Sequence, residues 1–197
     1  MTYNPLDLEN LADQLRRTLE EQPPCRLDKV PLFEGAGVYC LYYRGPFALY
    51  KGLARVNRSQ LNLPIYVGKA VTEAARKGGG VAMDIPAPLL HSRIQKHASS
   101  IMAAVSTLSV TDFAVRWLAT LPVWVPLGEA ALIARYRPLW NVVIDGFGNN
   151  DPGARRRNQY RSVWDHLHPG RAWAALQASN PGFSESTIGA KVAAHLR

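Results

Sequence analysis

The sequence has few cysteines, few acidic residues and no long apolar run. Cys25 and Cys40 are the only cysteines, so no second pair is present to build a zinc site, and both suit a reduced compartment as buried apolar side chains. No apolar stretch approaches the ~20 residues that a membrane span requires. The beginning of the sequence carries Asp7, Glu9 and Asp13, which is unlike a signal peptide. These absences predict a cytoplasmic protein that does not enter the membrane.

The shortage of acidic residues leaves a strongly basic chain. Asp and Glu total 15 against 23 Lys and Arg, which gives a net charge of +8 at pH 7. Such a balance favours a polyanionic partner, most often a nucleic acid, although a cationic surface kept for solubility has the same composition. With 197 residues, 47% of them hydrophobic, the chain is typical of one globular domain with appendages.

Hydrophobic periodicity predicts an α/β (α+β) domain with a small, mainly antiparallel sheet of three strands flanked by helices. β-rich runs place the strands at 38–43, 65–68 and 113–117, with 47–50 as a further candidate and a short extended run at 140–144. Helical spacing predicts helices at 5–22, 89–105, 127–136, 169–178 and 184–196. Within one compact domain, the chain then divides into an N-terminal helical arm (1–30), a core (31–145) and a C-terminal basic and helical extension (146–197).

The N-terminal arm carries a leucine stripe. Leu8, Leu11, Leu15 and Leu19 recur at spacings of three and four, so they share one face of the helix. That face packs either on the main domain or on a second subunit, and the sequence leaves both possibilities open.

Glu129 is the most distinctive candidate for chemistry. Leu132, Ile133 and Tyr136 follow it at three, four and seven residues, so its carboxylate belongs to the apolar face of a helix. A carboxylate there needs a cation or strong donors. Metal ligation, pairing with an arginine and capping of the first helical turn each meet that need.

Arg93 and His97 lie one turn apart on the helix predicted at 89–105. Leu90, Ile94, Ala98, Ile101 and Val105 form its apolar arc, and the two polar side chains fall just off the edge of that arc. A guanidinium can bind phosphate oxygens in a bidentate manner, and an imidazole can move a proton near neutral pH. Taken singly, each is more often a surface residue or a satisfied core histidine.

Two tyrosines stand beside glycines on the predicted strands, in Gly37-Val38-Tyr39 and Tyr66-Val67-Gly68. Most strand tyrosines are only sheet aromatics. A phenol with a pKa of ~10 is a poor base at pH 7 unless a neighbour assists it. His97, Lys69 or a metal-bound water could give that assistance.

These motifs, in this order, resemble the GIY-YIG nuclease superfamily. The resemblance rests on the two tyrosine triplets, Lys69, the helical Arg93, Glu129 and the ending Pro138-Leu139-Trp140-Asn141, and it covers roughly residues 35–145. Valine replaces isoleucine in both triplets. The 26 residues between the tyrosines, the position of His97 and the tail at 162–171 are similar to the type II restriction endonuclease branch, in particular to enzymes that cut the GC-rich palindrome CCGCGG.

The resemblance implies roles for individual residues. Glu129 would hold one divalent ion per active site, expected to be Mg²⁺, and Arg93 would steady the scissile phosphate. Tyr39 would help to deprotonate the attacking water with His97 hydrogen-bonded to it. Tyr66 and Asn141 would orient the phosphate or support the surroundings of the metal, and Lys69 would neutralise phosphate charge or tune Tyr39. Asp84, Asp112 and Asp145 are rival ligands; Asp84 falls in a proline-flanked loop and Asp112 begins a strand, so neither of these two is predicted on an apolar helix face.

The DNA contacts are expected from polar and basic side chains outside this set, between the tyrosines, beside the triple glycine at 78–80 and in the C-terminal extension. The candidates are Lys51, Arg55, Arg58, Gln60, Arg76, Lys77, Arg155, Arg156, Arg157, Arg161 and Arg171. For each of them a solvated surface position is the alternative.

The resemblance implies Mg²⁺-dependent, site-specific cleavage of double-stranded DNA. A palindrome cut on both strands calls for two sites related by a two-fold axis, so a homodimer is expected. A structure-directed repair or homing nuclease of the same superfamily is one alternative. A DNA-binding protein on an inactive nuclease scaffold is the other.

Overall fold

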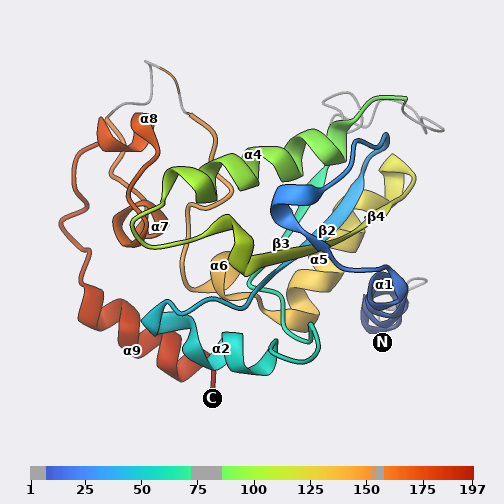
Figure 1. The fold of residues 1–197 in the computed structure, drawn as a ribbon, viewed down its shortest axis with the longest axis horizontal. Helices are drawn as coiled ribbons and strands as arrows, with labels where there is room; N and C mark the ends of the chain where they lie inside the picture. Colours follow the sequence, from blue (N-terminus) through green and yellow to red (C-terminus); the bar gives the residue numbers. More distant parts are fainter. Residues whose placement is uncertain (1–7, 72–85, 152, 154–157) are drawn as a thin grey trace, which may run out of the picture.

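The computed structural model describes residues 8–71, 86–151, 153 and 158–197, and it has an α+β fold around one antiparallel sheet (Figure 1). The strand order is β1-β4-β2-β3. The strands are β1 (Cys25–Arg26), β2 (Gly37–Tyr43), β3 (Tyr66–Ala70) and β4 (Phe113–Ala119). The sheet therefore has a fourth strand that the sequence did not predict, because two residues are too short to show an alternating pattern.

The central strand β2 is buried on both faces of the sheet, and its alternating side chains belong to two hydrophobic clusters. Tyr39, Leu41 and Tyr43 face the larger cluster, whereas Val38 and Cys40 face the smaller one. The register pairs Tyr39 with Gly68 and Val38 with Lys69 on β3. Because paired residues point to the same side, the two signature motifs meet on the face of the larger cluster.

The face of the larger cluster is covered by α4 (Leu89–Ala103) and by C-terminal elements. The predicted apolar arc of α4 is buried as far as Ile101, but Val105 is exposed because the helix ends at Ala103. Trp164 and Ile188 from the C-terminal extension lie in the same cluster. The C-terminal elements are α7 (Val163–Leu167), α8 (Ala172–Ala175) and α9 (Glu185–His195).

The opposite face is covered by α5 (Val125–Tyr136), and α1 (Leu8–Glu21) packs against α5. A Cβ at Gly128 would lie 3.2 Å from a methyl group of Leu15, so the two helices approach closely there. Leu19 is buried in the smaller cluster. Leu15 and Leu19 of the leucine stripe thus pack within their own chain.

Two segments expected to be extended are helical. Residues 47–50 form the 3₁₀ turn η2 (Ala48–Tyr50), which continues into α2 (Lys51–Val56), and residues 139–142 form α6 (Leu139–Val142). Their aromatic and β-branched residues suggested strands, but Tyr50 and Trp140 are buried in the larger cluster from helical turns instead. The other short helical turns are η1 (Leu27–Lys29), η3 (Val110–Asp112) and η4 (Pro122–Trp124). No helix in the described ranges is long and apolar enough to cross a membrane.

Candidate active site

The two signature tyrosines meet over Gly68. A Cβ on that glycine would overlap the hydroxyl group of Tyr39 and would lie 2.8 Å from Cε1 of Tyr66. The ring centroids of the tyrosines are 6.2 Å apart. Glycine is therefore required at this position because the aromatic side chains occupy the space above it.

His97 projects from α4 into the same aromatic group. Its ring centroid lies 5.6 Å from that of Tyr39 and 5.2 Å from that of Tyr66, and Phe147 stacks on it at 4.4 Å with an interplanar angle of 23°. The imidazole is buried in the core, deeper than the rim position expected from the helical wheel, whereas Arg93 is half-buried.

Burial sets the protonation of these groups. It raises the pKa of Tyr39 well above its usual value and also raises the pKa of Tyr66, while the nearby Arg93 guanidinium opposes both shifts. Burial lowers the pKa of His97 well below its usual value, with further lowering by the positive charges of Arg93 and Arg171. At neutral pH both phenols are therefore protonated and the imidazole is neutral.

Two polar atoms of this group have no hydrogen-bond partner among the described residues. They are the hydroxyl oxygen of Tyr39 and Nε2 of His97, and both are buried, so the hydrogen bond expected between Tyr39 and His97 is absent. Because buried polar atoms are nearly always paired, such atoms mark a place for a water molecule or a substrate group. Arg93 lies close enough to both side chains to lower the pKa of Tyr39 and of His97.

Arg93 is fixed by the segment that follows α6. Its Nη1 donates to the amide oxygen of Asn150 at 2.9 Å, and its Nη2 donates to the carbonyl oxygen of Gly148 at 2.7 Å. The guanidinium also lies close enough to lower the pKa of both tyrosines. Arg93 is thus held in place at the mouth of the aromatic group.

Glu129 reaches the site from α5, on the other side of the sheet. Its carboxylate pairs with Nζ of Lys69 at 2.5 Å, and its side chain is 21% exposed. Tyr66, Arg93, Lys69 and Glu129 all line an open cavity of about 360 Å³. Because β3 is the edge strand, this cavity joins residues from both faces of the sheet around its edge. Glu129, the charged residue on the apolar face of α5, is paired with Lys69 and not with an arginine, which the sequence analysis considered as its partner.

Asn141 lies at the same strand edge. Its amide oxygen accepts from the backbone N–H of Val67 at 2.8 Å, and its amide nitrogen donates to the carbonyl of Val67 at 2.9 Å. The side chain therefore occupies the free hydrogen-bonding groups in the middle of β3. A role in orienting phosphate remains a prediction.

The residues around the cavity fit a magnesium ion that is held by one carboxylate. Within the described ranges, no three His, Cys, Asp or Glu side chains are grouped so that they could hold a metal together. Mg²⁺ commonly keeps several waters and binds one or two carboxylates together with substrate phosphates. Glu129 is the one carboxylate among the described residues lining the cavity, which Asp112 and Asp145 do not line; Asp84 lies outside the described residues.

The family comparison agrees with this geometry. The family model described as the Eco29kI GIY-YIG domain matches residues 31–196. The chain belongs to this family. It is a family of restriction endonuclease domains, which makes this protein a nuclease-type domain with DNA as its substrate. No curated protein matches the sequence.

In this Eco29kI-type domain, the candidate DNA contacts fall into three groups. Lys51, Arg55, Arg58 and Gln60 are exposed on and just after α2, so they are free to meet a polyanion. Arg161 is half-buried and donates to the carbonyls of Ala174 and Ala175. Arg76, Lys77, Arg155, Arg156 and Arg157 lie outside the described residues.

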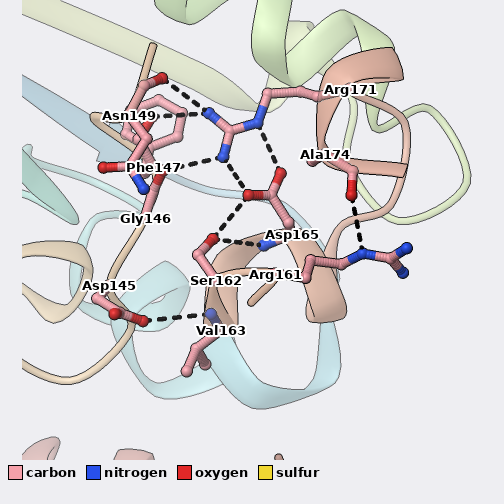
Figure 2. A network of polar contacts seen from close by, with 10 residues as sticks. All are labelled: Asp145, Gly146, Phe147, Asn149, Arg161, Ser162, Val163, Asp165, Arg171 and Ala174. Atoms are coloured by element: carbon pink, nitrogen blue, oxygen red, sulfur yellow. Dashed lines mark hydrogen bonds and ion pairs between the residues drawn. The ribbon is translucent and has the colours of Figure 1, made fainter. Parts of the chain in front are cut away.

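Arg171 does not occupy the surface position predicted for it. It is 5% exposed and forms an ion pair with Asp165, with a distance of 2.6 Å between Nη2 and Oδ2. Its remaining N–H groups donate to backbone carbonyls of the segment 146–149 (Figure 2). The prediction that Arg171 contacts DNA is wrong for this structure, because the guanidinium has no donor left for a phosphate.

Sequence reasoning also missed the part of the Eco29kI-type site that lies after α6. Phe147 packs on His97 and Tyr66, while Gly148 and Asn150 bind Arg93. The available signal was the change to a glycine- and asparagine-rich composition from Gly146 onward, which was interpreted as the boundary of an extension. A glycine- and asparagine-rich composition does not predict against which part of the fold the segment packs, so only the structure places it beside Arg93 and His97.

Proposed function

We propose that this Eco29kI-type domain is a type II restriction endonuclease that makes Mg²⁺-dependent double-strand cuts at a palindromic, GC-rich DNA sequence. The observation that carries the proposal is that the Tyr39 hydroxyl and His97 Nε2 are buried without a well-formed hydrogen bond, while the Arg93 guanidinium lies near enough to the Tyr39 hydroxyl to lower its pKa. The cavity that Arg93 lines also contains Glu129. This set of groups can bind a phosphate, place a water molecule and accept its proton.

The protonation states suggest how the proton moves. The water oxygen attacks phosphorus, the bond from phosphorus to the leaving sugar oxygen breaks, and the proton of the water must leave. Burial keeps Tyr39 protonated and His97 neutral, and the two side chains are not hydrogen-bonded to each other, so a bridging water would carry the proton of Tyr39 to His97 as Tyr39 accepts the proton of the attacking water. This relay needs no free phenolate.

Charge stabilisation comes from the other side of the site. Arg93 donates to the phosphate oxygens and offsets the charge that builds up in the transition state. Glu129 would hold Mg²⁺, and the bound ion would supply a second positive charge beside the phosphate. Lys69, which pairs with Glu129 in the protein alone, is then free to face the phosphate.

The target and the assembly follow from symmetry and from the exposed basic residues. Cutting both strands of a palindrome requires two copies of the site related by a two-fold axis, so the protein acts as a homodimer. Arg55 and Arg58 are exposed, and arginine pairs with the O6 and N7 atoms of guanine in the major groove. A GC-rich sequence is the target that suits such contacts.

The deciding experiment is digestion of plasmid DNA with Mg²⁺ by the wild type, by Glu129→Ala and by Glu185→Ala. Glu185 is an exposed carboxylate on α9, so its removal is the matched control. We expect discrete fragments from the wild type and the control, and retained DNA binding without cutting from Glu129→Ala. Random nicking would favour a structure-directed repair or homing nuclease, and no cutting with any divalent ion would favour a DNA-binding protein without catalysis.

A further inference from the structure

The segment 146–149 presents four consecutive carbonyl groups to two arginines. Arg171 donates to the carbonyls of Gly146, Phe147 and Asn149, at 2.9, 3.2 and 3.2 Å. Arg93 donates to the remaining carbonyl, that of Gly148. A short backbone segment is thus fixed from both sides by guanidinium groups.

Arg171 is itself held rigidly (Figure 2). Nε and Nη2 donate to the two carboxylate oxygens of Asp165 at 2.7 and 2.6 Å, and the hydroxyl of Ser162 donates to the same carboxylate. The guanidinium lies 4.6 Å from the ring centroids of both Trp164 and Trp173. Since a guanidinium has five N–H donors, these contacts and the three carbonyls account for all of them.

The same segment contacts three residues of the proposed catalytic group. Phe147 stacks on His97 and meets the edge of Tyr66 at 4.9 Å. Gly148 lies so close to Tyr66 that an added Cβ would be 2.7 Å from its hydroxyl oxygen, and Asn150 accepts from Arg93. A displacement of the segment 146–150 would therefore change the contacts of His97, Tyr66 and Arg93.

We propose that Arg171, anchored by Asp165, is a positioning residue that sets the placement of Arg93 and His97 through the segment 146–150. The catalytic part of this inference rests on the proposed nuclease function. Arg171 itself does not touch the reacting atoms. It acts by holding Phe147 against His97 and by presenting Gly148 and Asn150 to Arg93.

The conservative change Arg171→Lys separates positioning from charge. Lysine keeps the positive charge and can keep the pair with Asp165, but its three donors on one nitrogen cannot span the carboxylate and three carbonyls. Arg161→Lys is the matched control, because among the described residues the guanidinium of Arg161 donates to the carbonyls of Ala174 and Ala175, far from the segment 146–149 in sequence. Both variants retain the net charge.

The first measurement is proton NMR of the imidazole of His97 in the full chain without DNA or Mg²⁺, with the signal assigned by its loss in His97→Gln. The charged or titratable groups that face this ring are Tyr39 from β2, Tyr66 from β3, Arg93 from its own helix and Arg171 behind Phe147. In Arg171→Lys we expect a changed Hε1 shift, because the stacked Phe147 moves, and a titration midpoint closer to that of an ordinary histidine. Arg161→Lys should leave both unchanged.

The second measurement is single-turnover cleavage, with the protein in excess over the DNA and at a concentration well above the Kd for DNA. Arg171→Lys should lower the cleavage rate by about 10-fold or more, as expected when a catalytic group is misplaced, while Kd for DNA stays within about twofold. Asn150→Ala, an exposed change that removes only one contact to Arg93, should lower the rate without moving the His97 signal.

The outcomes are distinct. An unchanged His97 signal together with an unchanged rate in folded Arg171→Lys overturns the proposal, and so does a weakened Kd at an unchanged rate, which would make Arg171 a DNA contact. If Arg171→Lys does not fold, an unchanged rate in Asn150→Ala overturns it. A wild-type protein that cuts no DNA overturns the nuclease function instead, and the NMR result still decides whether Arg171 positions His97.

Discussion

Hydrogen bonds hold the side chain of Arg93 in place in the protein without substrate, which lowers the entropy cost of ordering that side chain on binding. A guanidinium free in water must be immobilised on binding, which costs ~0.5–1.5 kcal/mol per side chain. The bonds from Arg93 to Gly148 and Asn150 already meet part of that cost in the folded protein. The residue is therefore prepared to contact a phosphate at the cavity.

Replacing Arg93 tests its contact with the transition state. In Arg93→Ala we expect cleavage to slow by at least ~100-fold, in line with the loss of one donor to developing charge. The measurement is single-turnover cleavage, with Lys191→Ala as a control that removes one exposed positive charge from α9. Turnover equal to the wild type would remove Arg93 from the active site.

The sequence identifies site residues that belong to a recognisable local motif, but it does not identify residues whose role depends on a partner that the sequence pattern does not reveal. Tyr39 and Tyr66 could be found because glycine beside tyrosine on two strands is a short but ordered motif. Arg171 could not be interpreted correctly, since an arginine in a basic tail has the same appearance whether it meets DNA or a buried carboxylate. Its partner Asp165 lies six residues earlier, a spacing that fits no helical or strand contact.

At the scale of elements, the edge of β3 organises the site. Asn141 covers its middle at Val67, and beyond that point Lys69 and Ala70 line the cavity. An uncovered strand edge is a liability in most folds because it can pair with other chains. Here α6 protects part of the edge and leaves open the part that lines the cavity.

Gly68 tests the fit between the two signature strands. In Gly68→Ala the new methyl group meets Tyr39 and Tyr66, so we expect a loss of ~1–3 kcal/mol in the free energy of unfolding, as for other overpacked cores, and a loss of cleavage. Urea unfolding measures the first effect. Gly189→Ala on α9 is the control, because its Cβ meets Leu49 at an ordinary 3.6 Å and should stabilise that helix by up to ~1 kcal/mol. Equal stability of Gly68→Ala and wild type would contradict this packing.

Long periodic elements could be predicted, and short ones could not. The helices α4 and α5 were expected within a few residues of their observed bounds, because each has several buried residues in phase. The turns η2 and α6 were misassigned, since three or four residues carry no period and their aromatics favour strands in isolation. Tertiary burial of Tyr50 and Trp140 decided their conformation.

At the scale of the whole molecule, the C-terminal extension is part of the core. Trp164, Leu167, Ile188 and Val192 belong to the same hydrophobic cluster as Tyr39 and Tyr66, and the family match runs to residue 196. These described residues of the C-terminal extension therefore pack into the same hydrophobic cluster as the signature tyrosines.

The proposed homodimer can be tested by sedimentation. On a duplex that contains the target palindrome, we expect two chains of 21.8 kDa per DNA, with both strands cut in one binding event. Analytical ultracentrifugation with Glu129→Ala measures the stoichiometry without cleavage. A single chain on DNA that still cuts both strands together would exclude the two-fold arrangement.

The position of Arg171 has a consequence for how the protein is made. Domains fold as the chain emerges from the ribosome, N-terminal parts first. Every signature residue from Tyr39 to Asn141 is synthesised before Arg171, which fastens the segment beside Arg93 and His97. A growing chain therefore carries every residue of the proposed catalytic group before it carries the guanidinium that fixes the segment beside Arg93 and His97, so we expect the site to become ordered only after Arg171 has been added.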